Sequence, residues 1–205
     1  MAGLIGVFGG TFDPPHLGHL ILADEAAAAL DLEKVLWVVT GAPPHKPEPP
    51  RASVEERLEM VSTAIADAPS FEISRADVDR PPPHYALGTL AWLRERQPSA
   101  RWAYLMGSDS LVDLPRWHRA QDFLGALELL GVMMRPGQTL DLSALEDVLP
   151  GLESKCRVFE APLVGISARD IRRRIRGGLP FRYLVPPGVP DVILRHHLYT
   201  GAPSA

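Results

Sequence analysis

Apolar positions along the chain follow two different periods. Short apolar runs bounded by glycine, proline or polar residues are typical of buried strands, and apolar residues three or four positions apart are typical of helices. This pattern predicts strands over 3–8, 35–39, 71–78, 102–106, 127–134 and 157–159. It predicts helices over 17–30, 54–65, 86–96, 168–176 and 191–197.

The alternation of strands and helices predicts an α/β fold. Such a chain builds a Rossmann-like, doubly wound and mainly parallel sheet with helices on both faces. We expect one domain over residues 1–205, with a small C-terminal helical part over about 165–205. Ser53 and Glu56 have the spacing of a capping box, which predicts where the second helix begins.

Composition narrows the classes of protein. Apolar residues make up 46% of the chain, which is enough for a sizeable core, and the net charge of −4 argues against a general nucleic-acid binder. Cys156 is the one cysteine, and it lies in an expected strand, so a structural role is expected. A single cysteine fits a reducing compartment, and neither a secretion signal nor a membrane span is visible. We expect a cytoplasmic protein, and the sequence leaves its oligomeric state open, a homo-oligomer included.

Two proline-rich segments, over 41–51 and 80–85, are too polar and too rigid for a core. Each follows an expected strand and precedes an expected helix. Long ordered loops at the edge of an α/β sheet often carry function. We interpret both segments as loops on the ligand side of the sheet.

The turn after the first strand contains Gly9, Gly10 and Thr11. A strand, a glycine turn and a helix bring backbone N–H groups close to phosphates. The turn lacks the Gly-x-Gly-x-x-Gly pattern of dinucleotide-binding enzymes and the Gly-Lys pair of a P-loop. This absence disfavours a dehydrogenase.

His16 and His19 follow in the same segment, with Gly18 between them. A spacing of three places both imidazoles on one helical face, where they can donate to phosphate oxygens and stabilise a leaving pyrophosphate. Gly18 is expected to keep this face open to a ligand. Metal ligation is the rival interpretation, but a third ligand with suitable spacing is not evident.

Five segments in order resemble the motifs of the bacterial nicotinate-nucleotide adenylyltransferases, which belong to the nucleotidyltransferase superfamily. The resemblance covers almost the whole chain, and the common order and spacing make it more specific than any single motif. The segments are Gly9–His19, Pro43–Lys46, Gly107–Leu111, Pro115–Trp117 and Ile166–Arg172.

The resemblance implies an ATP site with four catalytic groups. Arg172 lies beside the expected buried face of its helix, which would hold it rigidly, and the helix starts with unpaired N–H groups. The catalytic candidates are His16, His19, Lys46 and Arg172. The ATP-binding candidates are Gly9, Gly10, Thr11, His16, His19, Gly107, Ser167, Ala168 and Arg172.

The resemblance also implies a mononucleotide site. Lys46 would place a charge on a phosphate, Asp109 would accept a ribose hydroxyl, and Trp117 would stack on the pyridine ring. Tyr85 and Thr89 complete this set of candidates.

Two positions depart from the family pattern. Arg169 stands where the family has a small hydroxyl residue, which removes a phosphate contact or replaces it with a charged one. Ala86 stands where a Ser-Tyr-Thr segment has threonine, so Thr89 or the backbone would have to substitute.

The expected activity is the transfer of AMP from ATP to nicotinate mononucleotide, giving deamido-NAD and pyrophosphate. Mg²⁺ would arrive on ATP, and no dedicated metal-binding residues are expected. Nicotinamide mononucleotide and phosphopantetheine are alternative acceptors. A non-catalytic nucleotide sensor is the alternative from another class, although the chain keeps both histidines and Lys46.

Overall fold

A computed structural model describes residues 3–41, 49–134, 139–162 and 164–201. Within these ranges six strands form one sheet in the order β3-β2-β1-β4-β5-β6. All five neighbouring pairs are parallel. The strands are β1 (Leu4–Gly10), β2 (Leu32–Val39), β3 (Phe71–Ser74), β4 (Arg101–Gly107), β5 (Leu129–Met134) and β6 (Cys156–Glu160).

The strand order is that of the doubly wound dinucleotide-binding fold, and it confirms the predicted fold class. The helices of the described ranges are α1 (Leu17–Ala29), α2 (Val54–Ala64), α3 (Ala86–Arg96), α4 (Ser108–Asp113), α5 (Ala120–Gly125), α6 (Leu142–Glu146), α7 (Leu152–Lys155), α8 (Ala168–Arg176) and α9 (Val189–Arg195). Two short 3-10 helices are η1 (Leu114–Arg116) and η2 (Arg182–Leu184).

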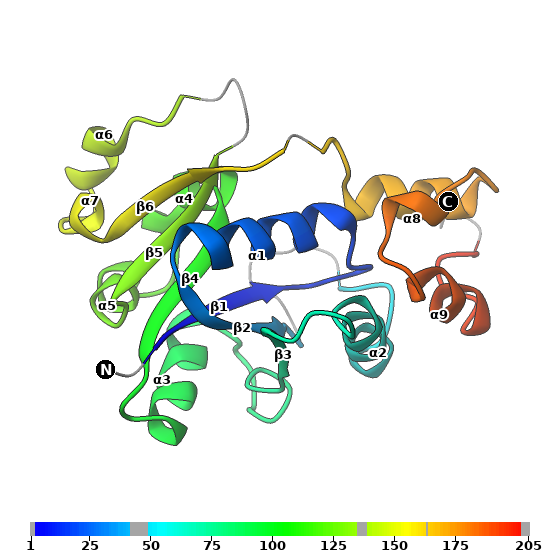
Figure 1. Cartoon of the computed structure of the whole chain (residues 1–205), viewed down its shortest axis with the longest axis horizontal. Helices are drawn as coiled ribbons and strands as arrows, with labels where there is room; N and C mark the ends of the chain where they lie inside the picture. Colours follow the sequence, from blue (N-terminus) through cyan, green and yellow to red (C-terminus); the bar gives the residue numbers. More distant parts are fainter. Residues whose placement is uncertain (1–2, 42–48, 135–138, 163, 202–205) are drawn as a thin grey trace.

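The sheet separates two apolar cores because successive side chains of a strand point to opposite faces. Ile5 and Val7 of β1 pack on the face covered by α3, α4 and α5. Phe8 packs on the other face, with α1 and α2. Figure 1 shows α1 along one face of the sheet and α3 on the opposite side.

A third, smaller core joins the C-terminal helices to α2. Met60 of α2 packs with Ile171 of α8 and with Val189, Val192 and Ile193 of α9. In Figure 1 these three helices lie together beyond the end of β1. The C-terminal part therefore packs against α2 and not on a face of the sheet.

Most predicted elements agree with the structure, and the α2 capping box is present. The Ser53 N–H donates to Glu56 Oε2 at 2.7 Å, and Ser53 Oγ accepts from the Glu56 N–H at 3.3 Å. The predicted strand over 71–78 was too long: it ends at Ser74, whose Oγ accepts from the Ala76 N–H, and turns follow.

Three other boundaries were also wrong. The strand predicted from residue 35 begins at Leu32. The strand predicted from residue 127 begins at Leu129, because the N–H of Leu127 still bonds to the Leu124 carbonyl at the end of α5. The last helix begins at Val189, where Pro190 suits the first turn because it lacks an N–H. The short helices α4, α5, α6 and α7 were not predicted, since four to six residues are too few to show a helical period.

Candidate active site

The predicted site lies where the strand order reverses, between β1 and β4. Chains leaving the carboxyl ends of these neighbouring strands turn to different faces of the sheet, which opens a crevice for ligands. The loop Thr11–His16 and α1 follow β1, and α4 follows β4 directly. The fold therefore brings the first and third family-like motifs to the same edge.

The two glycines at the end of β1 make room for protein side chains. A Cβ on Gly9 would lie 2.6 Å from the Tyr104 hydroxyl, and one on Gly10 would lie 2.7 Å from the ring of Phe12. Phe12 and Tyr104 are both buried. These glycines therefore let the Tyr104 and Phe12 side chains pack closely against the end of β1. The expected approach of phosphates to the backbone N–H groups of this turn stays a prediction.

His16 and His19 stack on one another. Their ring centroids are 3.6 Å apart with an interplanar angle of 19°. His16 is the N-cap of α1, and its backbone N–H donates to Nδ1 of His19 at 3.1 Å. A ring nitrogen that accepts carries no proton, so the neutral His19 ring carries its proton on Nε2. Phe12 packs edge-on against the same ring at 5.1 Å and fixes its plane.

The two imidazoles have different environments. His16 is only 8% exposed, and its Nδ1 has no hydrogen-bond partner in the described part of the chain. Burial lowers the pKa of His16 to about 4, so the ring is neutral near pH 7. A Cβ on Gly18 would lie 3.1 Å from His16 Nδ1, so this glycine makes room for the ring. Gly18 was expected to keep the helix face open to a ligand, and the structure shows it accommodating the first histidine.

Asp13 joins separate parts of the chain, and sequence reasoning did not select it. It is buried, and its two carboxylate oxygens accept from the N–H groups of Arg51 and Ala52 at 2.9 and 3.1 Å. The Tyr199 hydroxyl donates to the same carboxylate at 2.8 Å. The position of Asp13 within the motif was the available clue. Its partners come from segments that no sequence pattern connects to it.

Arg57 was also missed, because its position in α2 shows no feature that separates it from a solvated helix residue. The side chain is 1% exposed, although arginine is rarely buried. Its guanidinium donates to four backbone carbonyls, those of Thr11, Thr40, Gly41 and Ala52, at 2.7–3.3 Å. Burial lowers its pKa, and the charge of Asp13 opposes that shift. Arg57 thus ties the loop after β1 to the end of β2.

Arg172 is brought to the same edge by α8. Its guanidinium donates to the backbone carbonyl of Asp13 at 2.6 Å and lies 3.8 Å from Asp13 Oδ2. The neighbouring Arg173 and Arg174 instead form ion pairs with Asp170 on their own helix. The arginine selected from the sequence is therefore the one of these three that contacts the loop carrying the histidines.

The start of α8 has the predicted form. Ser167 is the N-cap, its Oγ accepts from the Asp170 N–H at 3.2 Å, and Ala168 is the first helical residue. Arg169 is exposed.

Gly107 ends β4 and is the N-cap of α4. Asp109 therefore lies in the first turn of a helix, although the sequence predicted a turn there, and its side chain is exposed.

The mononucleotide candidates gather around the start of α3 and the segment after α4. Tyr85 is the N-cap of α3, and its ring stacks on His118 with centroids 4.3 Å apart. Trp117 is half-buried and packs edge-on against Tyr104 at 6.0 Å. The structure therefore groups Tyr85 and Trp117 with an aromatic neighbour, His118, that was not selected. Lys46 lies outside the described residues.

Thr89 lies deeper than expected. It is buried, and its hydroxyl donates to Asp77 Oδ1 at 2.5 Å. Arg80 pairs with the same carboxylate oxygen at 2.8 Å and donates to the Ala76 carbonyl at 2.9 Å. The hydroxyl of Thr89 therefore holds the proline-rich loop over 80–85 to α3, and its proposed contact with the pyridine substituent stays a prediction.

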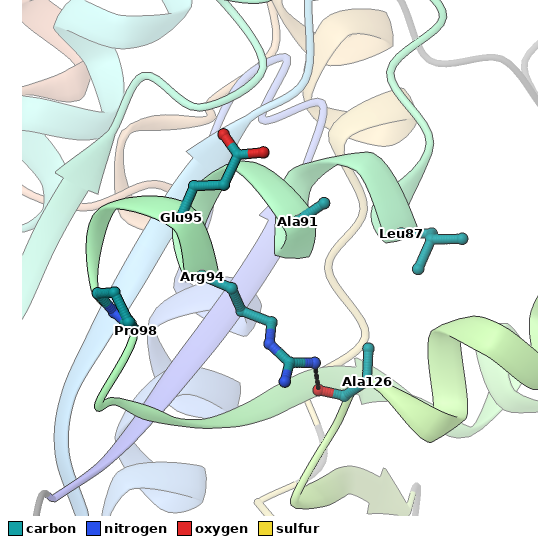
Figure 2. Close-up of a pocket in the computed structure, with 6 residues that line it drawn as sticks. All are labelled: Leu87, Ala91, Arg94, Glu95, Pro98 and Ala126. Carbon is teal, nitrogen blue, oxygen red and sulfur yellow. Dashed lines mark hydrogen bonds between the residues drawn. The ribbon is translucent and has the colours of Figure 1, made fainter.

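A shallow surface groove of about 530 Å³ lies elsewhere on α3. Figure 2 shows lining side chains from α3, from Pro98 just after it and from Ala126 after α5, and Arg94 donates to the Ala126 carbonyl at 3.2 Å. Leu87, Ala91 and Pro98 supply apolar surface. None of the predicted site residues lines this groove.

Comparison with known proteins identifies the class to which this site belongs. The cytidylyltransferase-like family model matches residues 7–174, which include both the histidine pair and Arg172. A "probable nicotinate-nucleotide adenylyltransferase" of Thermomicrobium roseum is 43% identical over 95% of this chain and 91% of its own length. One of Herpetosiphon aurantiacus is 40% identical over 95% and 98%. The chain is a nucleotidyltransferase. It belongs to the nicotinate-nucleotide adenylyltransferase family.

Solved structures agree with this fold. Nicotinic acid mononucleotide adenylyltransferase of Plasmodium falciparum complexed with NaAD superposes with a TM-score of 0.78 at 18% identity, over 96% of this chain and 97% of that one. The same enzyme complexed with APC gives a TM-score of 0.74 with the same coverage. Among the described residues, no helix has both the length and the apolar character to cross a bilayer.

Proposed function

We propose that this chain joins ATP and nicotinate mononucleotide to give nicotinate adenine dinucleotide and pyrophosphate. The observation that carries the proposal is the stacked pair His16 and His19, with Arg172 held against the loop just before them. This arrangement lies at the reversal point of the strand order. Family membership and the Plasmodium enzyme's complexes with NaAD and APC support the choice of substrates.

The reaction needs no covalent enzyme intermediate. An oxygen of the mononucleotide phosphate forms a bond to the α-phosphorus of ATP, and the bond from that phosphorus to the bridging oxygen of the β-phosphate breaks. Pyrophosphate leaves with the electron pair. Because a phosphate monoester is already nucleophilic, positioning and charge stabilisation provide the catalysis.

The residues of the chain would divide these tasks. The Nε2–H of His19 is a neutral donor in a fixed plane and would hydrogen-bond to phosphate oxygens as negative charge builds on the leaving group. His16, neutral through burial, supports that ring by stacking. Arg172 would supply the positive charge for the triphosphate. We assign Lys46 the same role from the sequence.

Mg²⁺ would neutralise part of the triphosphate charge when it enters with ATP. Asp13, the buried carboxylate beside the histidines, already accepts from two backbone N–H groups and from Tyr199. Within the described ranges no group of three or more His, Cys, Asp or Glu side chains is placed to hold a metal ion. We propose that the metal is bound mainly by ATP and water.

The mononucleotide would occupy the side of the site formed by Tyr85, Trp117 and Asp109. Tyr85 and Trp117 present aromatic surface for a pyridine ring. Asp109 is exposed at the start of α4, where a carboxylate can accept from ribose hydroxyls. We also propose a cytoplasmic location, which the single cysteine supports.

Parallel assays with nicotinate mononucleotide and nicotinamide mononucleotide test the proposal. ATP and Mg²⁺ are supplied in both, the dinucleotide is measured by chromatography, and pyrophosphate is measured by a coupled assay. We expect kcat/KM to be at least tenfold higher for the nicotinate form, with one pyrophosphate per dinucleotide. Equal rates, or a preference for the amide, would overturn the acceptor. Absence of both products would overturn the adenylyl transfer.

A further inference from the structure

The segment after α9 reaches the loop that carries the two histidines. Tyr199 donates its hydroxyl to Oδ1 of Asp13, a residue 186 positions earlier in the sequence. Tyr199 follows α9 and adopts a left-handed backbone conformation, with φ +64°. Its ring packs against the third core, with α2, α8 and α9. This core therefore holds the hydroxyl where it meets the carboxylate.

The hydroxyl keeps its proton and acts as a donor. Burial first, and then the negative charge of Asp13, raise the pKa of Tyr199 well above its ordinary value. A carboxylate accepts only, so the direction of this hydrogen bond is fixed. The hydrogen bond is 2.8 Å long, and its acceptor is a buried carboxylate, so it belongs to the charge-assisted class.

Asp13 is the link between Tyr199 and Arg172. The guanidinium of Arg172 donates to the Asp13 backbone carbonyl at 2.6 Å, but it remains 3.8 Å from the nearer carboxylate oxygen. Arginine and a carboxylate prefer two parallel hydrogen bonds when both are free to approach. In this structure the carboxylate is instead occupied by the N–H groups of Arg51 and Ala52 and by the Tyr199 hydroxyl.

We propose that Tyr199 is a positioning residue for ATP binding, because it keeps the carboxylate of Asp13 from capturing the guanidinium of Arg172. The proposal rests on the role of Arg172 in the proposed function. Without the hydroxyl, each carboxylate oxygen keeps one backbone N–H, that of Ala52 on Oδ1 and that of Arg51 on Oδ2. The carboxylate then turns to form a two-point ion pair with Arg172. The charge of the guanidinium is then paired within the protein, and Arg172 no longer binds the triphosphate.

A purely structural role for Tyr199 predicts a different result. If the hydroxyl only anchored the C-terminal segment to the body of the protein, its loss would lower the unfolding temperature. Both substrates would then bind more weakly, to a similar degree. In a positioning role, loss of the hydroxyl weakens the binding of ATP and leaves that of the mononucleotide unchanged. ATP affinity and mononucleotide KM therefore separate the two.

The first experiment uses Tyr199→Phe, which removes the hydroxyl and keeps the ring. We expect the Kd of ATP with Mg²⁺, measured by calorimetry without any acceptor, to rise about tenfold. The KM of nicotinate mononucleotide at saturating ATP should stay within twofold. Tyr183→Phe is the matched control, because Tyr183 is 88% exposed, and its Kd for ATP should equal that of wild type. An ATP Kd within twofold of wild type in Tyr199→Phe would overturn the proposal.

The second experiment tests whether Tyr199 acts through Arg172. Arg172→Lys removes the two-point geometry that the carboxylate would capture. Adding Tyr199→Phe to Arg172→Lys should therefore change the ATP Kd by less than twofold. If the double variant instead lost ATP affinity by the full product of the two single-variant factors, the proposal would be overturned. Because ATP binding is measured without an acceptor, these results stand apart from the choice of mononucleotide.

Discussion

The backbone N–H of His16 donates to Nδ1 of His19, while the rings of the same two residues stack 3.6 Å apart. One hydrogen bond therefore sets the start of α1 and also the tautomer of its second histidine. The proton of His19 is placed on Nε2 before any ligand binds. Because the two histidines are three positions apart, the His19 ring can reach back to the N–H of His16.

Replacing His19 should remove most of the activity with little loss of fold. We expect His19→Ala to lower kcat for pyrophosphate release about 100-fold or more, because a fixed donor to the leaving group is lost. The unfolding temperature should change by only a few degrees. His196→Ala is the control, since His196 contacts Glu59 on α2 at 2.8 Å. A His19→Ala enzyme within a few-fold of wild type would show that this donor is not used.

Burial of His16 predicts a loss of stability in acid. Its pKa is about 4 in the folded protein and near 6.5 when unfolded, so between these values the unfolded chain binds more protons. Stability from this residue is complete above pH 6.5 and is lost as the pH falls towards 4. At pH 4.5 the loss is about 2–3 kcal/mol relative to pH 7.

Denaturant unfolding of wild type and His16→Gln at pH 7 and pH 4.5 measures this effect. The difference in unfolding free energy between the two pH values should be about 2 kcal/mol smaller in His16→Gln, because its buried group cannot be protonated. The same pH dependence in both proteins would mean that His16 is not the buried base.

Gly18→Ala separates activity from stability. The new Cβ would lie 3.1 Å from Nδ1 and 3.2 Å from Cε1 of His16, so the ring must shift by a few tenths of an ångström. Alanine also favours the helix by about 1 kcal/mol. We expect at least a tenfold loss of kcat/KM with an unfolding free energy equal to or above that of wild type.

Gly125→Ala is the matched control for this substitution, because a Cβ there meets nothing within 4 Å. It should leave kcat/KM unchanged. Wild-type activity in Gly18→Ala would contradict the role of Gly18 in accommodating the His16 ring.

Arg57 should be one of the most important residues for stability. Replacement by leucine leaves four carbonyls without their donor and removes one of the two positive charges near Asp13, the other being that of Arg172. We expect Arg57→Leu to lower the unfolding free energy by about 3 kcal/mol or more. Arg116→Leu, at a side chain that is 85% exposed, should cost less than about 0.5 kcal/mol. Equal effects in denaturant unfolding would contradict this role.

The sequence alone determined the elements whose pattern is local. The period of apolar residues located β1, α1, α3 and α8 to within two residues, and Ser53 with Glu56 located the start of α2. The motif from Gly9 to His19 identified the candidate phosphate site for the same reason, since its residues act within one loop and one helical turn.

Only the tertiary structure decided which distant groups meet. Asp13, Arg57 and Tyr199 belong to three separate segments, and the partners of each depend on how α2, α8 and α9 pack beyond the end of β1. Gly18 had a plausible role from sequence, but the space it leaves is filled by the His16 ring. Local periodicity records the preferences of neighbouring residues. Hydrogen bonds between segments depend on the shape of the packed core, which no single stretch of sequence contains.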